Sequence, residues 1–79
     1  MNPEDFQKWD VIKFRQSNET RSKIGIVRHV STEWTMLGEK IIFVDLEIGK
    51  RRELVSFGSE FGSIKQWEYL HNLNPENWD

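Results

Sequence analysis

The sequence predicts a small domain made mainly of β-strands that closes into a barrel of four or five antiparallel strands. The chain has 79 residues, and two runs of β-branched and aromatic residues within 41–57 form the expected pattern of a hairpin. Similar runs lie before and after it. A hairpin alone is marginally stable in water, so these runs are expected to pair with it. Closure into a barrel would then remove the exposed strand edges.

Polar residues around Gly49 connect the two halves of this hairpin. If Gly49 and its neighbour formed a two-residue turn, Glu53 would lie opposite Leu46, within an apolar row. We therefore expect a three-residue loop with glycine at the position of positive φ, which places Ile42 opposite Leu54. One face of the hairpin would then carry Ile42, Val44, Leu46 and Leu54. The reverse face would be half apolar and would need partial cover.

The residues before the hairpin predict one helical turn and two strands. A short helix is expected to begin at Pro3, since proline suits the first helical position. Strands are expected over 9–15 and 24–31. The segment 16–22 between them contains no apolar residue and is expected to be a solvated loop. Gly25, inside the second strand, indicates a bulge or a close backbone approach.

The segment after the hairpin has two interpretations. Apolar residues at spacings of three and four favour a helical turn after Ser63. We expect this turn to be followed by an extended segment, 69–73. A final strand through 67–70 is the alternative.

Length and composition indicate one domain over residues 1–74 and a polar tail over 75–79. The absence of cysteine excludes disulfides and thiolate metal sites, and favours an intracellular protein. The acidic N-terminus lacks the features of a secretory signal, and no apolar run approaches about 18 residues. We expect a cytoplasmic protein that does not associate with a membrane.

The net charge of −2 argues against general affinity for nucleic acid or an anionic membrane. The charge is unevenly distributed, however. Residues 8–30 contain six basic residues against two acidic ones, whereas the chain after Glu53 has Lys65 as its one basic residue. The molecule is therefore expected to be polarised, unless its two halves neutralise each other on the surface.

Two short segments carry a family resemblance. Residues 9–14 are Trp-Asp-Val-Ile-Lys-Phe, and residues 25–30 are Gly-Ile-Val-Arg-His-Val. Together they resemble the opening of small SH3-like barrels of the KOW, Tudor-like and PsaE type, in which an Asp-Val strand, a polar loop and a Gly-x-Val strand recur. The resemblance implies an SH3-like barrel over 8–73, with short helical turns near both ends. The sequence departs from the pattern at Trp9, where many such modules have glycine.

The residue types of catalysis and metal binding do not form recognisable groups. His29 and His71 lack the spacing and the companion ligands of a zinc site. The loop 58–63 lacks the Gly-Lys-Ser/Thr ending of a phosphate loop and the pattern of a nucleophile elbow. We expect a protein that is not an enzyme and uses no cofactor or metal.

Aromatic and basic residues favour a binding function instead. Four Trp, five Phe and one Tyr exceed what a small core can bury, because each contributes roughly 150–250 Å² of surface. Some are expected to face outward, with Trp34 and either Trp67 or Trp78 as candidates, unless all four tryptophans close the barrel ends. The predicted partner-binding surface consists of Lys13, Arg15, Arg21, Lys23, Arg28, Trp34, Lys50, Arg51, Arg52 and Trp67.

The function expected from these features is that of a monomeric accessory or regulatory module, such as a phage-type inhibitor or adaptor, that engages a larger protein partner. Binding of RNA or single-stranded DNA in a KOW or Tudor-like manner is the first alternative. The PsaE-type resemblance implies a second one, the docking of an acidic redox carrier. The barrel architecture by itself does not decide among them.

Overall fold

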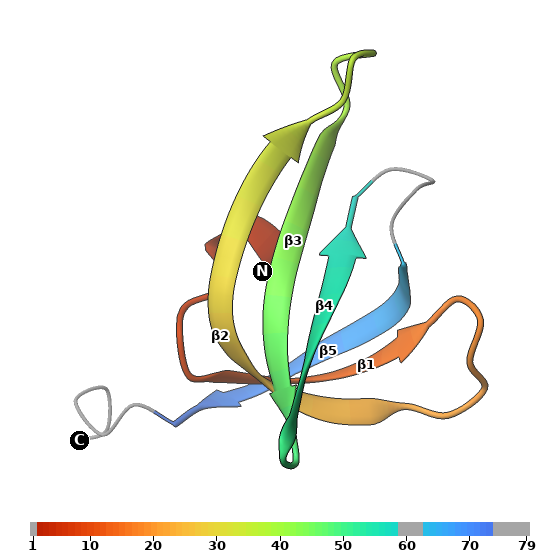
Figure 1. Cartoon of the computed structure of the whole chain (residues 1–79). Coiled ribbons are helices and arrows are strands. Elements are labelled where there is room, and N and C mark those ends of the chain that lie inside the picture. The colour runs from red at the N-terminus through yellow and green to blue at the C-terminus, as the bar shows by residue number, and fades with distance from the viewer. Residues whose placement is uncertain (1, 59–62, 74–79) are drawn as a thin grey trace.

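The computed structural model describes residues 2–58 and 63–73. The described chain forms one 3₁₀ turn and five strands (Figure 1). Their bounds are Pro3–Asp5 (η1), Asp10–Gln16 (β1), Lys23–Trp34 (β2), Lys40–Ile48 (β3), Arg51–Phe57 (β4) and Ile64–Asn72 (β5). The order across the sheet is β4-β3-β2-β1-β5, and all neighbours are antiparallel. The predicted mainly β fold with five antiparallel strands is confirmed, as is the helical turn at Pro3.

The sheet is curved, but it is not closed into a barrel. β4 and β5 are its two edges, and no ladder joins them within the described ranges. Their nearest ends are linked by Ser56 and Ser63, whose backbone N–H groups each donate to the other's hydroxyl at 3.0 Å. The prediction of a closed barrel is therefore wrong. β5 pairs along β1 instead of completing a ring with β4.

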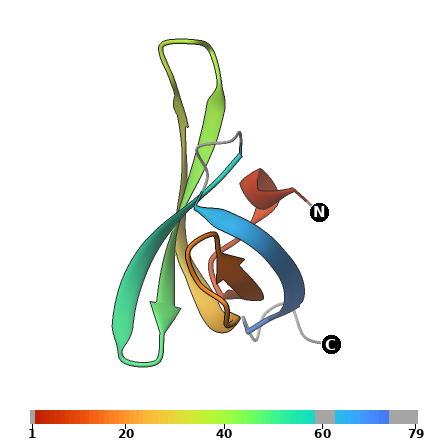
Figure 2. The same cartoon turned by 90° about the vertical axis from the view of Figure 1, so that its right-hand side faces the viewer.

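Strand β2 produces the curvature of the sheet. Its first part, as far as Ile26, pairs with β1, and its second part, from Ile26 onward, pairs with β3. The register shifts between Val27 and His29, where Arg28 is an extra residue. A bulge of this kind bends a strand and increases its twist. As a result β1 and β5 run across the inner face of β3 and β4 (Figures 1 and 2).

The close approach predicted at Gly25 is confirmed. A Cβ atom at this position would lie 3.2 Å from Cβ of Leu46 and 3.3 Å from Cε1 of Phe14. Glycine therefore lets β2 pack directly against core side chains. The bulge itself lies further along the strand, at Arg28.

The core fills the inner face of the curved sheet. Aromatic rings close one end of it: the ring of Phe6 lies 5.7 Å from Phe57 and 5.1 Å from Trp67, and both contacts are edge-to-face. Such pairs are preferred by the aromatic quadrupole. The side chains with less than 2 % exposure are those of Ile12, Phe14, Val27, Val44, Leu46 and Val55.

The turn between β3 and β4 corrects the predicted hairpin register. Ile48 pairs with Arg51, so the turn has two residues, Gly49 and Lys50. Gly49 has φ of 63° at the first central position, which is where a type II′ turn requires it. The predicted three-residue loop is therefore wrong.

This register places Leu46 opposite Glu53, a pairing that was expected to be unfavourable because it puts a carboxylate in an apolar row. Oε2 of Glu53 is shielded from solvent and has no hydrogen-bond partner in the described residues, but it forms an ion pair with Lys23, whose Nζ lies 3.6 Å away. Val55 is consequently in the core with 1 % exposure. Leu54 is 65 % exposed on the outer face, so its predicted position on the apolar face is wrong.

The last element is a strand and not the predicted helical turn. Trp67 and Tyr69, two residues apart, lie opposite Phe14 and Ile12 of β1 and pack against the core. The edge of β1 supplies hydrogen-bond partners to a strand, and this pairing outweighs the helical spacing of the apolar residues. The alternative of a final strand is correct.

One carboxylate, that of Asp10, is buried within the fold, with 3 % exposure. It accepts hydrogen bonds from the backbone N–H of Gln7 and from Nδ2 of Asn72, both at 2.7 Å. The hydroxyl of Tyr69 lies 3.5 Å away and also donates to it. Asp10 thus joins the start of β1 to the end of β5.

The described part of the chain contains no helix long and apolar enough to span a membrane. The predicted tail, 75–79, and Trp78 lie outside the described residues.

The observed register predicts that substitutions of two neighbouring residues change the stability of the fold by very different amounts. Val55→Ala should lower the free energy of unfolding by about 2 kcal/mol, because it removes buried methyl groups and leaves a cavity. Leu54→Ala should change it by less than about 0.5 kcal/mol, because the side chain is exposed. Urea denaturation of both variants measures the difference. A larger loss for Leu54→Ala would restore the three-residue loop.

Tyr69, the one tyrosine of the chain, should titrate above its ordinary value of 10.0. Burial raises the pKa of Tyr69, and the charge and hydrogen bond of Asp10 raise it further. Since the folded state then holds the proton more tightly than the unfolded state, this contribution to stability is complete below pH 10 and is lost as the pH rises through the folded pKa.

Phenolate absorbance reports Tyr69 alone, so an alkaline titration measures its midpoint directly. We expect a midpoint above pH 10 in the folded protein, near 10 in denaturant, and an intermediate value for Asp10→Asn. A folded midpoint at or below 10 would contradict the buried contact with Asp10.

Candidate binding surface

The connection between β2 and β3 projects beyond the rest of the molecule in both views (Figures 1 and 2). We call residues 34–40 the hairpin end. The N–H of Thr35 donates to the carbonyl of Glu39 at 2.8 Å, and the N–H of Gly38 donates to the carbonyl of Thr35 at 3.0 Å. The N–H of Glu39 also donates to Oγ1 of Thr35 at 3.0 Å. The hairpin end is therefore a hydrogen-bonded turn.

Trp34 faces outward at the base of this turn, with 67 % of its surface exposed. Lys40 lies opposite it in the ladder, and its Nζ is 5.9 Å from the ring centroid. The same ammonium group forms an ion pair with the carboxylate of Glu4. These contacts keep the charge of Lys40 beside the ring and leave most of the indole open to a partner.

Trp67, the other predicted aromatic anchor within the described residues, is part of the core packing. Its ring makes edge-to-face contacts with Phe6 and Phe57, at centroid distances of 5.1 and 6.0 Å. This packing gives Trp67 a structural role, so no binding partner is needed to explain why a tryptophan is present. Trp34 is therefore the aromatic residue that the structure offers to a binding surface.

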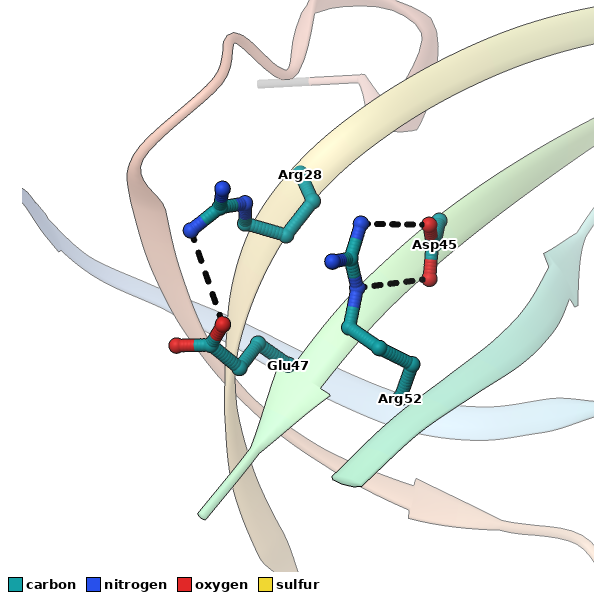
Figure 3. Close-up of polar contacts among 4 residues, drawn as sticks. All are labelled: Arg28, Asp45, Glu47 and Arg52. Atoms are coloured by element: carbon teal, nitrogen blue, oxygen red, sulfur yellow. Dashed lines mark hydrogen bonds and ion pairs between the residues drawn. The ribbon is translucent and has the colours of Figure 1, made fainter. Parts of the chain in front are cut away.

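Two of the predicted basic residues are paired with carboxylates on the outer face of the sheet (Figure 3). Arg52 donates to Asp45 through Nη2 at 2.9 Å and through Nε at 3.3 Å. Nη1 of Arg28 lies 3.5 Å from Oε1 of Glu47. The four side chains form a neutral group. On the outer face of β2, β3 and β4, the charges of Arg28 and Arg52 are therefore balanced by neighbouring carboxylates.

Lys23 is paired as well. Its Nζ donates to Oε1 of Glu19 at 2.9 Å and lies 3.6 Å from Oε2 of Glu53. The hydrogen bond to Glu19 raises the pKa of Lys23 above its usual value, and the charge of Glu53 acts in the same direction against desolvation. Arg15 donates to the carbonyl of Glu19 at 3.2 Å. Both cations therefore stabilise the loop that carries Glu19.

The remaining predicted cations are exposed and make no ion pair with other residues in the described parts of the chain: Lys13, Arg21, Lys50 and Arg51. Lys50 and Arg51 lie at the β3–β4 turn. Lys13 lies on β1 beside an open hollow that Lys65, Phe14 and Trp67 also line. The structure thus divides the predicted surface into separate groups.

Trp9 makes a contact that was not predicted from the sequence. The guanidinium carbon of Arg28 lies 4.3 Å from its ring centroid, and Nζ of Lys8 lies 5.4 Å from it. Cations at such distances are attracted to the face of an indole. Arg28 is therefore held between Trp9 and Glu47, and its guanidinium is part of the fold.

The backbone of Trp9 has an unusual conformation. Its φ of 79° makes it the one non-glycine residue with positive φ in the described ranges. Its N–H donates to the carbonyl of Val27 at 2.8 Å, and its carbonyl accepts from Leu73 at 2.9 Å. Glycine adopts this conformation without strain, whereas a residue with a Cβ atom does not.

Met36 and Leu37 were not among the predicted site residues, although they are the most exposed large apolar side chains described. Met36 is fully exposed and Leu37 is 84 % exposed. The sequence feature that could have identified Met36 and Leu37 is that they form an apolar pair directly before Gly38. Because a turn at this position lies beyond the last core residues, its side chains cannot reach the core.

Comparisons with protein-family models, curated proteins and solved structures found no match. The surface is therefore defined by its geometry alone. Within residues 2–58 and 63–73, no group of three or more His, Cys, Asp or Glu side chains is placed to hold a metal ion.

The conformation of Trp9 predicts an unusual order of stability among its variants. Trp9→Ala loses the contact with Arg28 and keeps a side chain at positive φ, whereas Trp9→Gly loses the same contact and relieves the strain. We expect the alanine variant to be less stable than the glycine variant by roughly 1 kcal/mol. Denaturant unfolding measures this difference. A glycine variant less stable than the alanine variant would show that position 9 is not left-handed.

Proposed function

We propose that this protein is a non-catalytic accessory or regulatory module that binds a protein partner, with Trp34 as the aromatic anchor. The observation that carries the proposal is the exposed indole on a hydrogen-bonded hairpin end that projects from the sheet (Figure 2). Tryptophan is enriched among the few residues that dominate the energy of protein interfaces. A turn that is already ordered loses little conformational entropy on binding.

The pairing of the cations supports a protein partner over a nucleic acid. Lys23, Arg28 and Arg52 each have a carboxylate partner, so a phosphate backbone would have to displace these carboxylates. Affinity for nucleic acid depends on cations that neutralise phosphates. Lys50 and Arg51 are exposed, but they lie at the other end of β3 from Trp34 and do not extend its surface (Figure 1).

We propose no catalytic role for the buried Asp10. Its carboxylate accepts hydrogen bonds from Gln7, Tyr69 and Asn72, which join two strands. These contacts give it a structural purpose.

Binding of single-stranded nucleic acid is the second candidate. The observation in its favour is the open hollow lined by Lys13, Lys65, Phe14 and Trp67. Lysines beside aromatic rings are typical of grooves that follow a phosphate backbone and stack bases. Phe14 is 1 % exposed and Trp67 packs on the core, so little ring surface is available for stacking.

Affinity capture with the tagged full chain tests the first candidate. The wild-type chain should retain a defined protein from a lysate of its source cells, and Trp34→Ala should lose it. Trp34→Phe, which keeps an aromatic ring, should retain part of the binding and serves as the matched control.

Fluorescence anisotropy with a labelled single-stranded oligonucleotide of mixed sequence tests the second candidate. We expect no binding at low salt. Binding that weakens steeply with added salt and is lost in Lys13→Glu, together with failure to capture any protein, would replace the first candidate with the second.

A further inference from the structure

The hairpin end carries an apolar group larger than the single anchor of the proposed function. Trp34, Met36 and Leu37 are 67 %, 104 % and 84 % exposed, and they follow one another within four positions of the chain. Monomeric proteins rarely expose contiguous apolar patches of more than a few hundred Å², and such patches mark interaction sites. Here the group occupies a convex projection (Figures 1 and 2).

The hairpin end combines a backbone held by hydrogen bonds with a flexible apolar side chain. The hydrogen bonds of Thr35 to Gly38 and Glu39 fix the turn. Met36 has an unbranched and polarisable side chain that fits irregular cavities. A convex apolar projection of this kind is complementary to a concave pocket.

Acidic residues flank the apolar group in the sequence. Glu33 is exposed immediately before Trp34, and Glu39, which follows the turn, is partly buried. Oε2 of Glu39 is shielded from solvent and has no hydrogen-bond partner in the described part of the chain. The nearby cation, Lys40, is already paired with Glu4. Glu33 and Glu39 therefore give the base of the projection a negative charge, and we call these two residues the acidic collar. A partner that covers the acidic collar needs positive charge at the matching positions.

We infer that Trp34, Met36 and Leu37 together insert into a concave apolar pocket of the partner protein, and that basic residues line the rim of this pocket. The inference rests on the proposed function and specifies the chemistry of its partner. The exposed Glu33 faces the basic rim, and the partly buried Glu39 adds negative charge beside it. Trp34 and Leu37 fill the pocket, with Met36 at the tip.

The acidic collar favours a protein with a basic rim over three other partners that could cover an apolar projection: a lipid membrane, a nucleic acid and a second copy of this chain. Hairpins and helices that insert into lipid carry Lys and Arg at the headgroup level, whereas Glu33 and Glu39 would be repelled by an anionic leaflet. Phosphates of a nucleic acid would be repelled in the same way. A second copy would bring two convex, acidic ends together, which are complementary neither in shape nor in charge.

The test begins with the protein that the wild-type chain retains in affinity capture, purified and titrated with the full chain and its variants. The double variant Met36→Asp with Leu37→Asp should bind at least about 30-fold more weakly, as expected when interface anchors are lost. Leu54→Asp is the matched control, because Leu54 is also exposed but lies on β4. It should bind within about 2-fold of wild type, as expected outside the interface.

The charge of the collar is tested by kinetics. Glu33→Lys should lower the association rate several-fold and weaken its dependence on salt, since rim charges act mainly on encounter. Glu33→Gln should have a smaller effect in the same direction. All variants should unfold at the denaturant concentration of wild type, because the substituted side chains are exposed.

The outcomes separate the inference from the function on which it rests. If wild type retains no protein, both fail. If it retains a protein that binds the double variant as tightly as wild type, the inference fails and the proposed function stands. Co-sedimentation with phosphatidylcholine vesicles, or dimerisation in sedimentation velocity, would also overturn the inference if the double variant abolished it.

Discussion

The whole structure depends on one strand that pairs with two different neighbours. β2 begins beside β1 and ends beside β3, and the extra residue Arg28 turns it between the two. Without this bend the five strands would form a flat sheet with one large apolar face in water. With it, β1 and β5 cross the inner face of β3 and β4, and a short chain encloses a core. Arg28 is held in place by Trp9 and Glu47, so the bulge and the outer face are stabilised together.

Whether a segment forms a helix or a strand could be predicted wherever the sequence pattern is strong. The prediction was wrong where two patterns compete. The β-branched runs of β1, β3, β4 and the first part of β2 predict strands, and the proline that begins η1 predicts a helical turn. Residues 64–72 contain both a helical spacing and an alternation, and the edge of β1 decides between them by offering hydrogen bonds. The predicted register of β3 and β4 was wrong for a different reason. Glu53 was judged by its place in an apolar row, whereas its carboxylate reaches Lys23 on a strand that the local sequence does not reveal.

The candidate surface shows the same limit. The exposure of Trp34 follows from a local argument about polar neighbours and surplus aromatic residues, and the structure places it outward. The pairing of Arg28 with Glu47 and of Arg52 with Asp45 depends on contacts between strands, so counts of charge along the chain overstate the basic surface. Met36 and Leu37 were visible in the sequence, but their exposure requires knowing that β2 and β3 continue past the last buried residues.

The serine contact between β4 and β5 has a consequence for behaviour at high concentration. A sheet that does not close offers unpaired strand edges, on which other chains can stack and begin fibrous aggregates. In β4 the N–H of Ser56 is already taken by Ser63, and Arg51 at the start of the strand is an exposed charge without an ion pair in the described residues. The stretch left for strand addition is shorter than β4 itself. The pair of serines therefore limits strand addition at an edge that the fold leaves open.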